Sequence, residues 1–551
     1  MLPDRGRPST TTLLAGAAVG VYLLVVAGAT AALADAARAC PEWPVCGGSL
    51  TRPGVLVAMG HRALAAVVGV VVLATAVAVF RRGSSRRVRA TALLAVVLFP
   101  AQALVGALLA TRGAAAPLPA VHLGLGLAIF GTLVLSLAWH LERETGEPSE
   151  EAAGTAPVNP TTVATGAVAD PGGPGNEPVR ALENPGGEPE YSRAGEPTTT
   201  TAQNDSARAD THADPARADT HADPARADTH ADPARADTHA DPARADTHAD
   251  PARADTSAVP SRSTAIRERL LAYVRLTKPR LMWLLCLVAG AGMALAAGPD
   301  LTVRTVVLTL SGGVLAIGAS GTFNHVLERD RDQQMRRTAD RPLATHQVPV
   351  ANATAFGTAL AVASLAVFLQ LNLLVAGLGF AAILFYTVVY TLLLKPNTVQ
   401  NTVIGGAAGA LPAVIGWAAA TGRVGLTGLA LAALVFAWTP AHFYNLALAY
   451  KEDYASGGFP MMPVVRGDTE TRKHILLWLG TTLAAAGGLL WVTDLGFLVA
   501  GTTVLLGAGF LWAVLRLHRE QTEAAAFRAF HASNAFLGAV LVAVVVDALV
   551  L

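Results

Sequence analysis

The sequence predicts an all-α integral membrane protein built from two helical blocks. The chain has 551 residues, of which 52% are hydrophobic and 15% charged, a balance typical of membrane proteins rather than soluble domains. Apolar runs of about 20 residues recur along it, long enough for helices to cross a bilayer. A long polar stretch separates these runs, so we expect a first block at 1–141, a linker at 142–269 and a second block at 270–551.

The apolar runs predict four membrane spans in the first block and nine in the second. Each run has helical length and is bounded by polar or turn-forming residues. The expected spans are 11–33, 54–80, 90–111 and 118–140, followed by 280–298, 303–323, 352–370, 372–393, 402–420, 425–445, 475–492, 495–516 and 531–551.

Basic residues predict how these spans are oriented. When the spans alternate across the membrane, most basic residues fall on one side, and such loops are usually cytoplasmic. The N-terminus and the linker are therefore expected in the cytoplasm, and the C-terminus outside the cell membrane. The basic residues on the expected cytoplasmic side are Arg5, Arg7, Arg81, Arg82, Arg86, Arg87, Arg89, Arg336, Arg337, Lys395, Arg472, Lys473, Arg516 and Arg519.

The linker contains a short tandem repeat. The nonapeptide ARADTHADP occurs in five full copies over 207–251, and no apolar residue in it is larger than alanine or proline. Such a segment cannot bury enough apolar surface to offset the entropy lost on ordering. We therefore expect the linker to be disordered.

An acidic motif with basic residues just after it ends the span 303–323. Asn324, Glu328 and Asp332 lie four residues apart, and each such step on a helix leaves a drift of only about 40°, so their oxygens share one face. Mg²⁺ commonly takes one or two carboxylates together with substrate phosphates. The motif predicts a magnesium and diphosphate site, although a charged helix end in the headgroup layer is the plain alternative. The arginines expected to bind the diphosphate are Arg336, Arg337 and Arg341.

Three more polar clusters fall on the same expected side of the second block. They are the segments 277–280, 390–398 and 442–454, and the first two contain Lys278 and Lys395. Ionisable groups near a membrane are costly and so are candidates for function, while a lysine that merely extends to the interface is an equally good explanation for each alone. Four clusters on one face predict a single active site.

These motifs resemble the UbiA family of intramembrane prenyltransferases, and within it the heme O synthases, over about residues 270–551. The resemblance is carried by TKPR at 277–280, NHVLERDRDQQMRRTADRPL at 324–343, YTLLLKPNTVQ from Tyr390 and WTPAHFYNLALAYKEDY from Trp438. It implies a nine-helix UbiA-type bundle that transfers farnesyl from farnesyl diphosphate to a vinyl group of heme B, giving heme O for terminal oxidases. Relatives that prenylate quinone precursors carry a second DxxxD pair where this chain has His442, Glu452 and Asp453, which favours heme as the acceptor.

The resemblance and the chemistry together assign roles to the residues of the second block. The expected set is Asn324, Glu328 and Asp332 as Mg²⁺ ligands, with Lys395 beside them; Arg336, Arg337, Arg341 and Lys278 for diphosphate; and Tyr390, His442, Tyr444, Glu452 and Asp453 in the acceptor or cation pocket. Whether His442 contacts heme, diphosphate or only a hydrogen-bond partner stays open. The alternatives are a UbiA-type enzyme with another aromatic acceptor and a nonenzymatic heme carrier, which would not need diphosphate chemistry. No nucleic-acid partner is expected.

Two histidines in the first block lie at matched depth. His61 precedes Arg81 by 20 residues and His122 precedes Arg143 by 21, so each is about 30 Å above the expected cytoplasmic edge at 1.5 Å per residue. Two imidazoles at equal height on neighbouring helices can ligate one heme iron, and Arg62 could contact a propionate. Two unrelated interfacial histidines remain the alternative.

The first block resembles one half of the heme A synthases. The resemblance rests on AMGHR at 58–62, VHLGLGLA at 121–128 and CPEWPVC at 40–46. It implies a four-helix heme-binding bundle and a disulfide between Cys40 and Cys46 in an outer loop. Family members carry a glutamate where this chain has Ala58, and a second four-span half that is missing here. The block is therefore expected to hold or hand over heme, or to pair with a separate heme A synthase.

Overall fold

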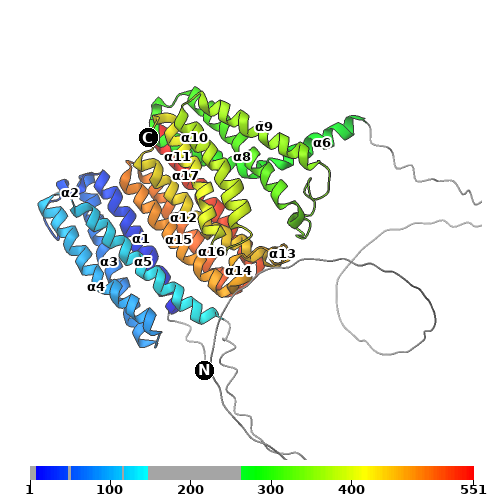
Figure 1. Ribbon diagram of the computed structural model, residues 1–551. Coiled ribbons are helices and arrows are strands. Elements are labelled where there is room, and N and C mark those ends of the chain that lie inside the picture. Colours follow the sequence, from blue (N-terminus) through cyan, green and yellow to red (C-terminus); the bar gives the residue numbers. More distant parts are fainter. Residues whose placement is uncertain (1–7, 48–50, 114–116, 147–261, 551) are drawn as a thin grey trace, which may run out of the picture. The chain divides into compact units, whose positions relative to one another are not determined.

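The computed structural model describes residues 8–47, 51–113, 117–146 and 262–550, and every regular element in these ranges is a helix (Figure 1). Thirteen of the described helical segments are long and apolar enough to cross a membrane, judged by length and composition. The predicted all-α membrane fold is confirmed. The repeats of the expected linker lie outside the described residues.

The N-terminal part is a four-helix bundle with one short helix between its first two long helices. Its helices are α1 (Thr10–Leu33), α2 (Ala36–Ala39), α3 (Pro53–Arg81), α4 (Arg86–Arg112) and α5 (Leu118–Thr145). Ser9 and Ser85 cap α1 and α4 by accepting hydrogen bonds from backbone N–H groups of the first turn. Helices α1 and α4 each pack against both α3 and α5, so α3 and α5 face each other across the bundle.

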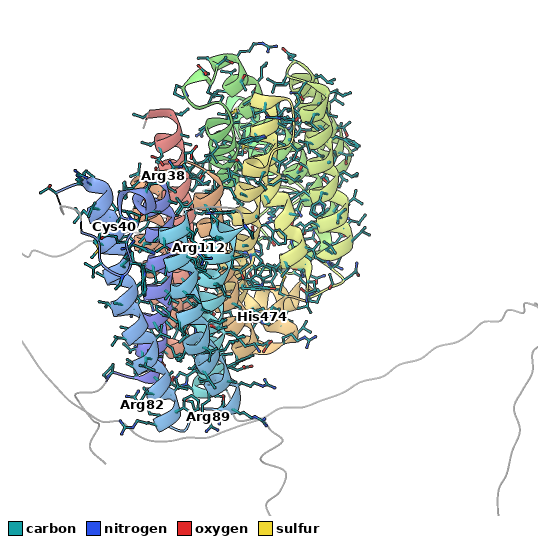
Figure 2. All side chains as sticks on the ribbon, turned by 90° about the vertical axis from the view of Figure 1, so that its left-hand side faces the viewer. Arg38, Cys40, Arg82, Arg89, Arg112 and His474 are labelled. Carbon is teal, nitrogen blue, oxygen red and sulfur yellow. A yellow bond between two sulfur atoms is a disulfide. The ribbon has the colours of Figure 1, made fainter. Side chains whose placement is uncertain are left out.

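The ends of this bundle differ in charge and composition. Figure 2 shows Arg38 and Cys40 toward one end and Arg82 and Arg89 at the other. The second end also carries Arg86 and Arg87 at the start of α4. This separation of the Cys40 loop from the basic end is the arrangement that the alternating spans predicted.

The second part contains the remaining helices. They are α6 (Arg262–Leu276), α7 (Pro279–Ala297), the 3₁₀ turn η2 (Gly298–Asp300), α8 (Val303–Asp332), α9 (Val350–Leu369), α10 (Leu373–Leu384), the π-helix η3 (Phe385–Leu394), α11 (Asn401–Thr421), α12 (Leu426–Ala449), α13 (Lys451–Ser456), α14 (Met462–Val465), α15 (Gly467–Val492), α16 (Phe497–Glu520) and α17 (Glu523–Val550).

Helix α6 corrects the expected boundary of the linker. It begins at Arg262, inside the segment 142–269 that was expected to be disordered, and it packs against α8. Ile266 and Leu270 are four residues apart and so lie on one face of α6. This apolar stripe is too short for the helix to be recognised as a membrane span.

The second half of α7 packs closely on α11. A Cβ at Gly292 of α7 would collide with the backbone carbonyl of Ala413, and a Cβ at Gly416 of α11 would collide with that of Ala289. The two helices therefore approach at backbone distance, as small-residue packing allows in membranes.

Helices of the two parts also contact each other. Helix α5 packs along α15, where Val134 lies against Gly480. Lys473 Nζ lies 2.8 Å from Glu142 Oε1. The linker is thus not the only physical connection between the two described parts.

Candidate active site

A buried polar stripe lies on the last turns of α8, where the four-residue spacing predicted it. Asn324, Glu328 and Asp332 are only 2%, 3% and 1% exposed. Burying carboxylates is costly unless cationic groups neutralise them. This burial argues against a charged helix end in the headgroup layer and makes the stripe the candidate site.

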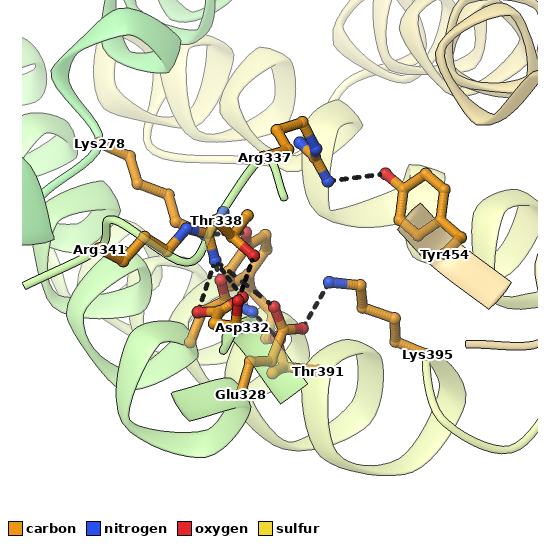
Figure 3. A network of polar contacts seen from close by, with 11 residues as sticks. Lys278, Glu328, Asp332, Arg337, Thr338, Arg341, Thr391, Lys395 and Tyr454 are labelled. Atoms are coloured by element: carbon orange, nitrogen blue, oxygen red, sulfur yellow. Dashed lines mark hydrogen bonds and ion pairs between the residues drawn. The ribbon is translucent and has the colours of Figure 1, made fainter. Parts of the chain in front are cut away.

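Three cations from separate segments surround the stripe (Figure 3). Lys278 Nζ donates a hydrogen bond to Asn324 Oδ1. Lys395 Nζ lies 2.6 Å from Glu328 Oε1. One guanidinium nitrogen of Arg341 donates to both oxygens of Asp332 at 2.8 Å. The sequence predicted that these three cations share the site with the stripe, and the structure brings them together.

The cluster has more positive than negative charge, since three cations face two carboxylates. Burial, with a smaller contribution from Arg341, lowers the pKa of Lys278 to about 7. Burial also lowers the pKa of Lys395, although Glu328 opposes this shift. A bound anion would stabilise both ammonium groups in their charged form, so the cluster is suited to hold a diphosphate.

The π-helix η3 places further groups against the stripe. Lys395 N–H donates to the Tyr390 carbonyl at 2.8 Å, and Thr391 Oγ1 donates to the Tyr386 carbonyl at 2.9 Å, both five residues back. Thr391 Oγ1 also accepts from Asn324 at 3.1 Å, and the Tyr386 and Tyr390 rings are 5.5 Å apart. Sequence reasoning missed Tyr386; its position four residues before Tyr390 was the available signal. π-Helical turns are frequent at functional sites.

The donor set of the stripe fits Mg²⁺ only if a ligand completes the coordination. Among the described residues no group of three or more His, Cys, Asp or Glu side chains could hold a metal. Glu328 and Asp332 supply two carboxylates and Asn324 one amide oxygen, all hard oxygen donors. Mg²⁺ is usually held by one or two carboxylates plus substrate phosphates, so the residues fit a magnesium diphosphate.

Arg336 and Arg337 do not join the cluster. Arg336 pairs with Glu452 at 3.0 Å, and the backbone N–H of Arg337 donates to Asp453 at 2.9 Å. The Arg337 guanidinium donates to the Tyr454 hydroxyl at 3.2 Å. These contacts tie the loop after α8 to α13. Arg336, Arg337, Glu452 and Asp453 therefore contact one another, and neither arginine contacts the stripe.

His442 and Tyr444 are also apart from the stripe. The His442 ring stacks between Trp438 and Phe530, with centroid distances of 4.2 and 4.4 Å, and its Nδ1 lies 2.7 Å from Ser533 Oγ. Tyr444 is fully buried. The structure places His442 in the packing of α12 on α17 with a hydroxyl as its partner.

The two histidines of the N-terminal part face the bundle interior. His61 on α3 lies against Gly28 of α1, and a Cβ at Gly106 of α4 would lie only 3.0 Å from His122 of α5. Both Nδ1 atoms are buried without a hydrogen-bond partner. The expectation of neighbouring helices was wrong, because α3 and α5 are diagonal; this arrangement still suits one ligand between two imidazoles.

Arg62 has a different role from the expected propionate contact. It donates to the Cys40 carbonyl at 2.8 Å and to the Glu42 carbonyl at 2.7 Å. Cys40 and Cys46 are joined in this loop, with Cα atoms 5.6 Å apart. Arg62, in the third turn of α3, therefore holds the loop against this helix.

Comparisons with known proteins identify the family. The UbiA prenyltransferase family model matches residues 283–539, and the cytochrome oxidase assembly protein model matches 53–169. A protoheme IX farnesyltransferase of Haloarcula marismortui is 55% identical over 98% of this chain and 98% of its own length. The chain belongs to the protoheme IX farnesyltransferases. A protein of that name from Natronomonas pharaonis is also 55% identical, over 98% of both chains.

Other relatives match only part of the chain. A protoheme IX farnesyltransferase of Saccharopolyspora erythraea is 43% identical over 52% of this chain and 93% of its own length. Among solved structures, a UbiA homologue of Archaeoglobus fulgidus bound to GPP and Mg²⁺ is 18% identical, with a TM-score of 0.40 over 50% of this chain and 99% of that one.

Proposed function

We propose that the protein transfers a farnesyl group from farnesyl diphosphate to a vinyl group of heme B and so makes heme O for terminal oxidases. The observation that carries this proposal is the similarity over nearly the whole chain to the farnesyltransferase of Haloarcula marismortui. The buried cluster of Lys278, Lys395 and Arg341 around two carboxylates supports it, since a prenyl diphosphate must be held by its charged end. No observation on the described residues favours another acceptor or a carrier.

The first step breaks the bond between farnesyl C1 and the diphosphate oxygen, which keeps the electron pair. Lys278, Lys395 and Arg341 would stabilise the charge that develops on the leaving group. Asn324, Glu328 and Asp332 would hold Mg²⁺, which when bound neutralises part of the diphosphate charge.

The second step joins farnesyl C1 to the terminal vinyl carbon, using the vinyl π electrons. Positive charge then passes to the vinyl carbon next to the porphyrin, where water adds and loses a proton. The product carries a hydroxyethylfarnesyl side chain. The rings of Tyr386 and Tyr390 lie beside the cluster and would shield the allylic cation through their faces.

The test is a defined reaction with the purified full-length protein. Heme B, farnesyl diphosphate and Mg²⁺ are incubated with it, and the heme product is analysed by mass spectrometry. We expect heme B to gain one farnesyl group and one hydroxyl group. A heme fraction of unchanged mass, with prenylation of a quinone precursor under the same conditions, would instead support the alternative acceptor.

For the N-terminal part we propose heme ligation by His61 and His122. Two buried imidazoles on diagonal helices, each with a buried Nδ1 lacking a partner, support this role. The part would hold substrate or product heme and hand it to or from a separate heme A synthase. We further propose that the N-terminus and linker are cytoplasmic, the C-terminus outside, and the Cys40–Cys46 loop in the oxidising outer space.

A further inference from the structure

An apolar cavity begins at the charged cluster and continues into the membrane-spanning bundle. Lys278 and Tyr386 line one end, and the rest of the wall is apolar apart from the side chains of Cys286, Thr309 and Ser320. Residues of α7, α8, α10 and α11 contribute, among them Leu285, Ala316 and Pro412. The cavity therefore offers a dry path for an apolar chain whose polar end is held by the cluster.

The depth of the cavity can be measured along α8, because this helix is continuous beside it. A Cβ at Gly321 would lie 3.4 Å from Lys278 Cγ, so Gly321 marks the level of the cluster. Gly312 lies nine residues earlier on α8, which is about 14 Å at 1.5 Å per residue. Phe368 of α9 lies at that depth, against Gly312, and lines the cavity, and the deepest α8 residues of the lining, Thr309 and Leu310, lie within one helical turn beyond it.

The Phe368 ring is fixed in a slot. It is 0% exposed. A Cβ at Gly312 would lie 2.6 Å from the ring, and a Cβ at Gly379 of α10 would lie 2.5 Å from it, so both glycines are needed to admit the ring. The hydroxyl of Ser364, one turn before Phe368, donates to the Gly312 carbonyl at 2.8 Å and anchors α9 to α8. A ring held this way cannot easily move aside for a longer ligand.

We infer that Phe368 is the floor of the prenyl pocket and limits the donor to three isoprene units. The inference rests on the proposed function. An extended isoprene unit spans about 5 Å, from carbon–carbon bonds of about 1.5 Å. Three units therefore fill the roughly 14 Å between the cluster level and Phe368, while a fourth unit would meet the ring.

The test is a competition between donors of different length. Purified full-length protein receives heme B, Mg²⁺ and equal amounts of farnesyl and geranylgeranyl diphosphate, and the prenylated hemes are quantified by mass. The wild type should make mainly the farnesyl product. Phe368→Ala should raise the ratio of geranylgeranyl to farnesyl product at least tenfold. Phe380→Ala is the matched control, because Phe380 on α10 is 54% exposed and does not line the cavity, and its ratio should equal that of the wild type.

A second variant covers the case in which Phe368→Ala fails to fold. Phe368→Leu removes less volume and should shift the ratio in the same direction by a smaller factor. Unchanged ratios in the folded Phe368 variants, from a wild type that farnesylates heme, would overturn this inference and leave the proposed function intact. A wild type that prenylates heme with neither donor would overturn both.

Discussion

At the scale of single residues, Lys395 matters most for the stability of the charged cluster. Its ion pair with Glu328 is buried, with side chains 10% and 4% exposed, and the next cation, Arg341, is 3.9 Å from the other Glu328 oxygen. Removing Lys395 leaves the buried Glu328 carboxylate without a cation closer than 3.9 Å, and breaking a buried pair costs about 3–5 kcal/mol. We predict that Lys395→Gln lowers the free energy of unfolding by about that amount, measured by thermal denaturation in detergent.

Lys451→Gln is the control for this prediction. Lys451 pairs with Asp468 at 2.8 Å, but their side chains are 43% and 44% exposed, so water screens the pair. Loss of such a pair should cost less than about 1 kcal/mol. Equal destabilisation by the two substitutions would contradict the larger contribution of the buried pair to the free energy of unfolding.

Spacing alone predicted the polar stripe, because i, i+4 and i+8 positions share a helix face in any α-helix. Lys278, Lys395 and Arg341 were also predicted to be near it. The positions of Arg336 and Arg337 could not be predicted, since they depend on how the loop after α8 turns toward α13. Tyr386 was missed because hydropathy treats all residues of an apolar span alike, and only its place four residues before Tyr390 pointed to the site.

At the scale of elements, the diagonal pairing of α3 and α5 makes heme binding by the N-terminal part testable. His61 and His122 project from opposite helices, and His122 is 3.4 Å from the Gln102 amide. If both imidazoles ligate one iron, the purified protein carries a low-spin heme. We predict that His61→Ala or His122→Ala removes at least half of the low-spin absorbance of the protein reconstituted with heme.

His140→Ala is the matched substitution for that experiment. His140 is also on α5, but it lies near the basic end of the bundle, 3.4 Å from Glu144. Its loss should leave the spectrum unchanged. Spectra that respond equally to all three substitutions, or to none, would refute ligation by this pair.

Hydrophobic length predicted the long helices well, because membrane thickness fixes a span at about 20 residues. It could not predict η3, since a π-helix differs from an α-helix only in bonding to the fifth instead of the fourth residue back, and this leaves the hydropathy unaltered. Helix α6 was missed for a related reason. It is amphipathic, so its mean hydropathy is below that of a membrane span.

At the scale of the whole molecule, the site is assembled from segments far apart in the sequence. Lys278 precedes α7, the stripe ends α8, Arg341 follows α8, and Lys395 follows η3. The expectation that cytoplasmic clusters meet at one face was partly right. The segment 442–454 contacts the loop after α8 instead of the stripe, because α12 packs on α15 and α17 and holds His442 between aromatic rings.

The central claim is that the α8 stripe holds a divalent ion against a diphosphate. The most direct test is electron paramagnetic resonance of Mn²⁺, which accepts the same oxygen ligands as Mg²⁺, with a nonhydrolysable farnesyl diphosphate analogue. We predict that the wild type binds Mn²⁺ together with the analogue. Asp332→Asn should weaken this binding at least about tenfold, which is close to the free energy of one charge-assisted hydrogen bond. Asp330→Asn, whose side chain is 76% exposed beside Arg329, should bind as the wild type does. A wild type that binds neither ion nor analogue, or undiminished binding by Asp332→Asn, would contradict the claim.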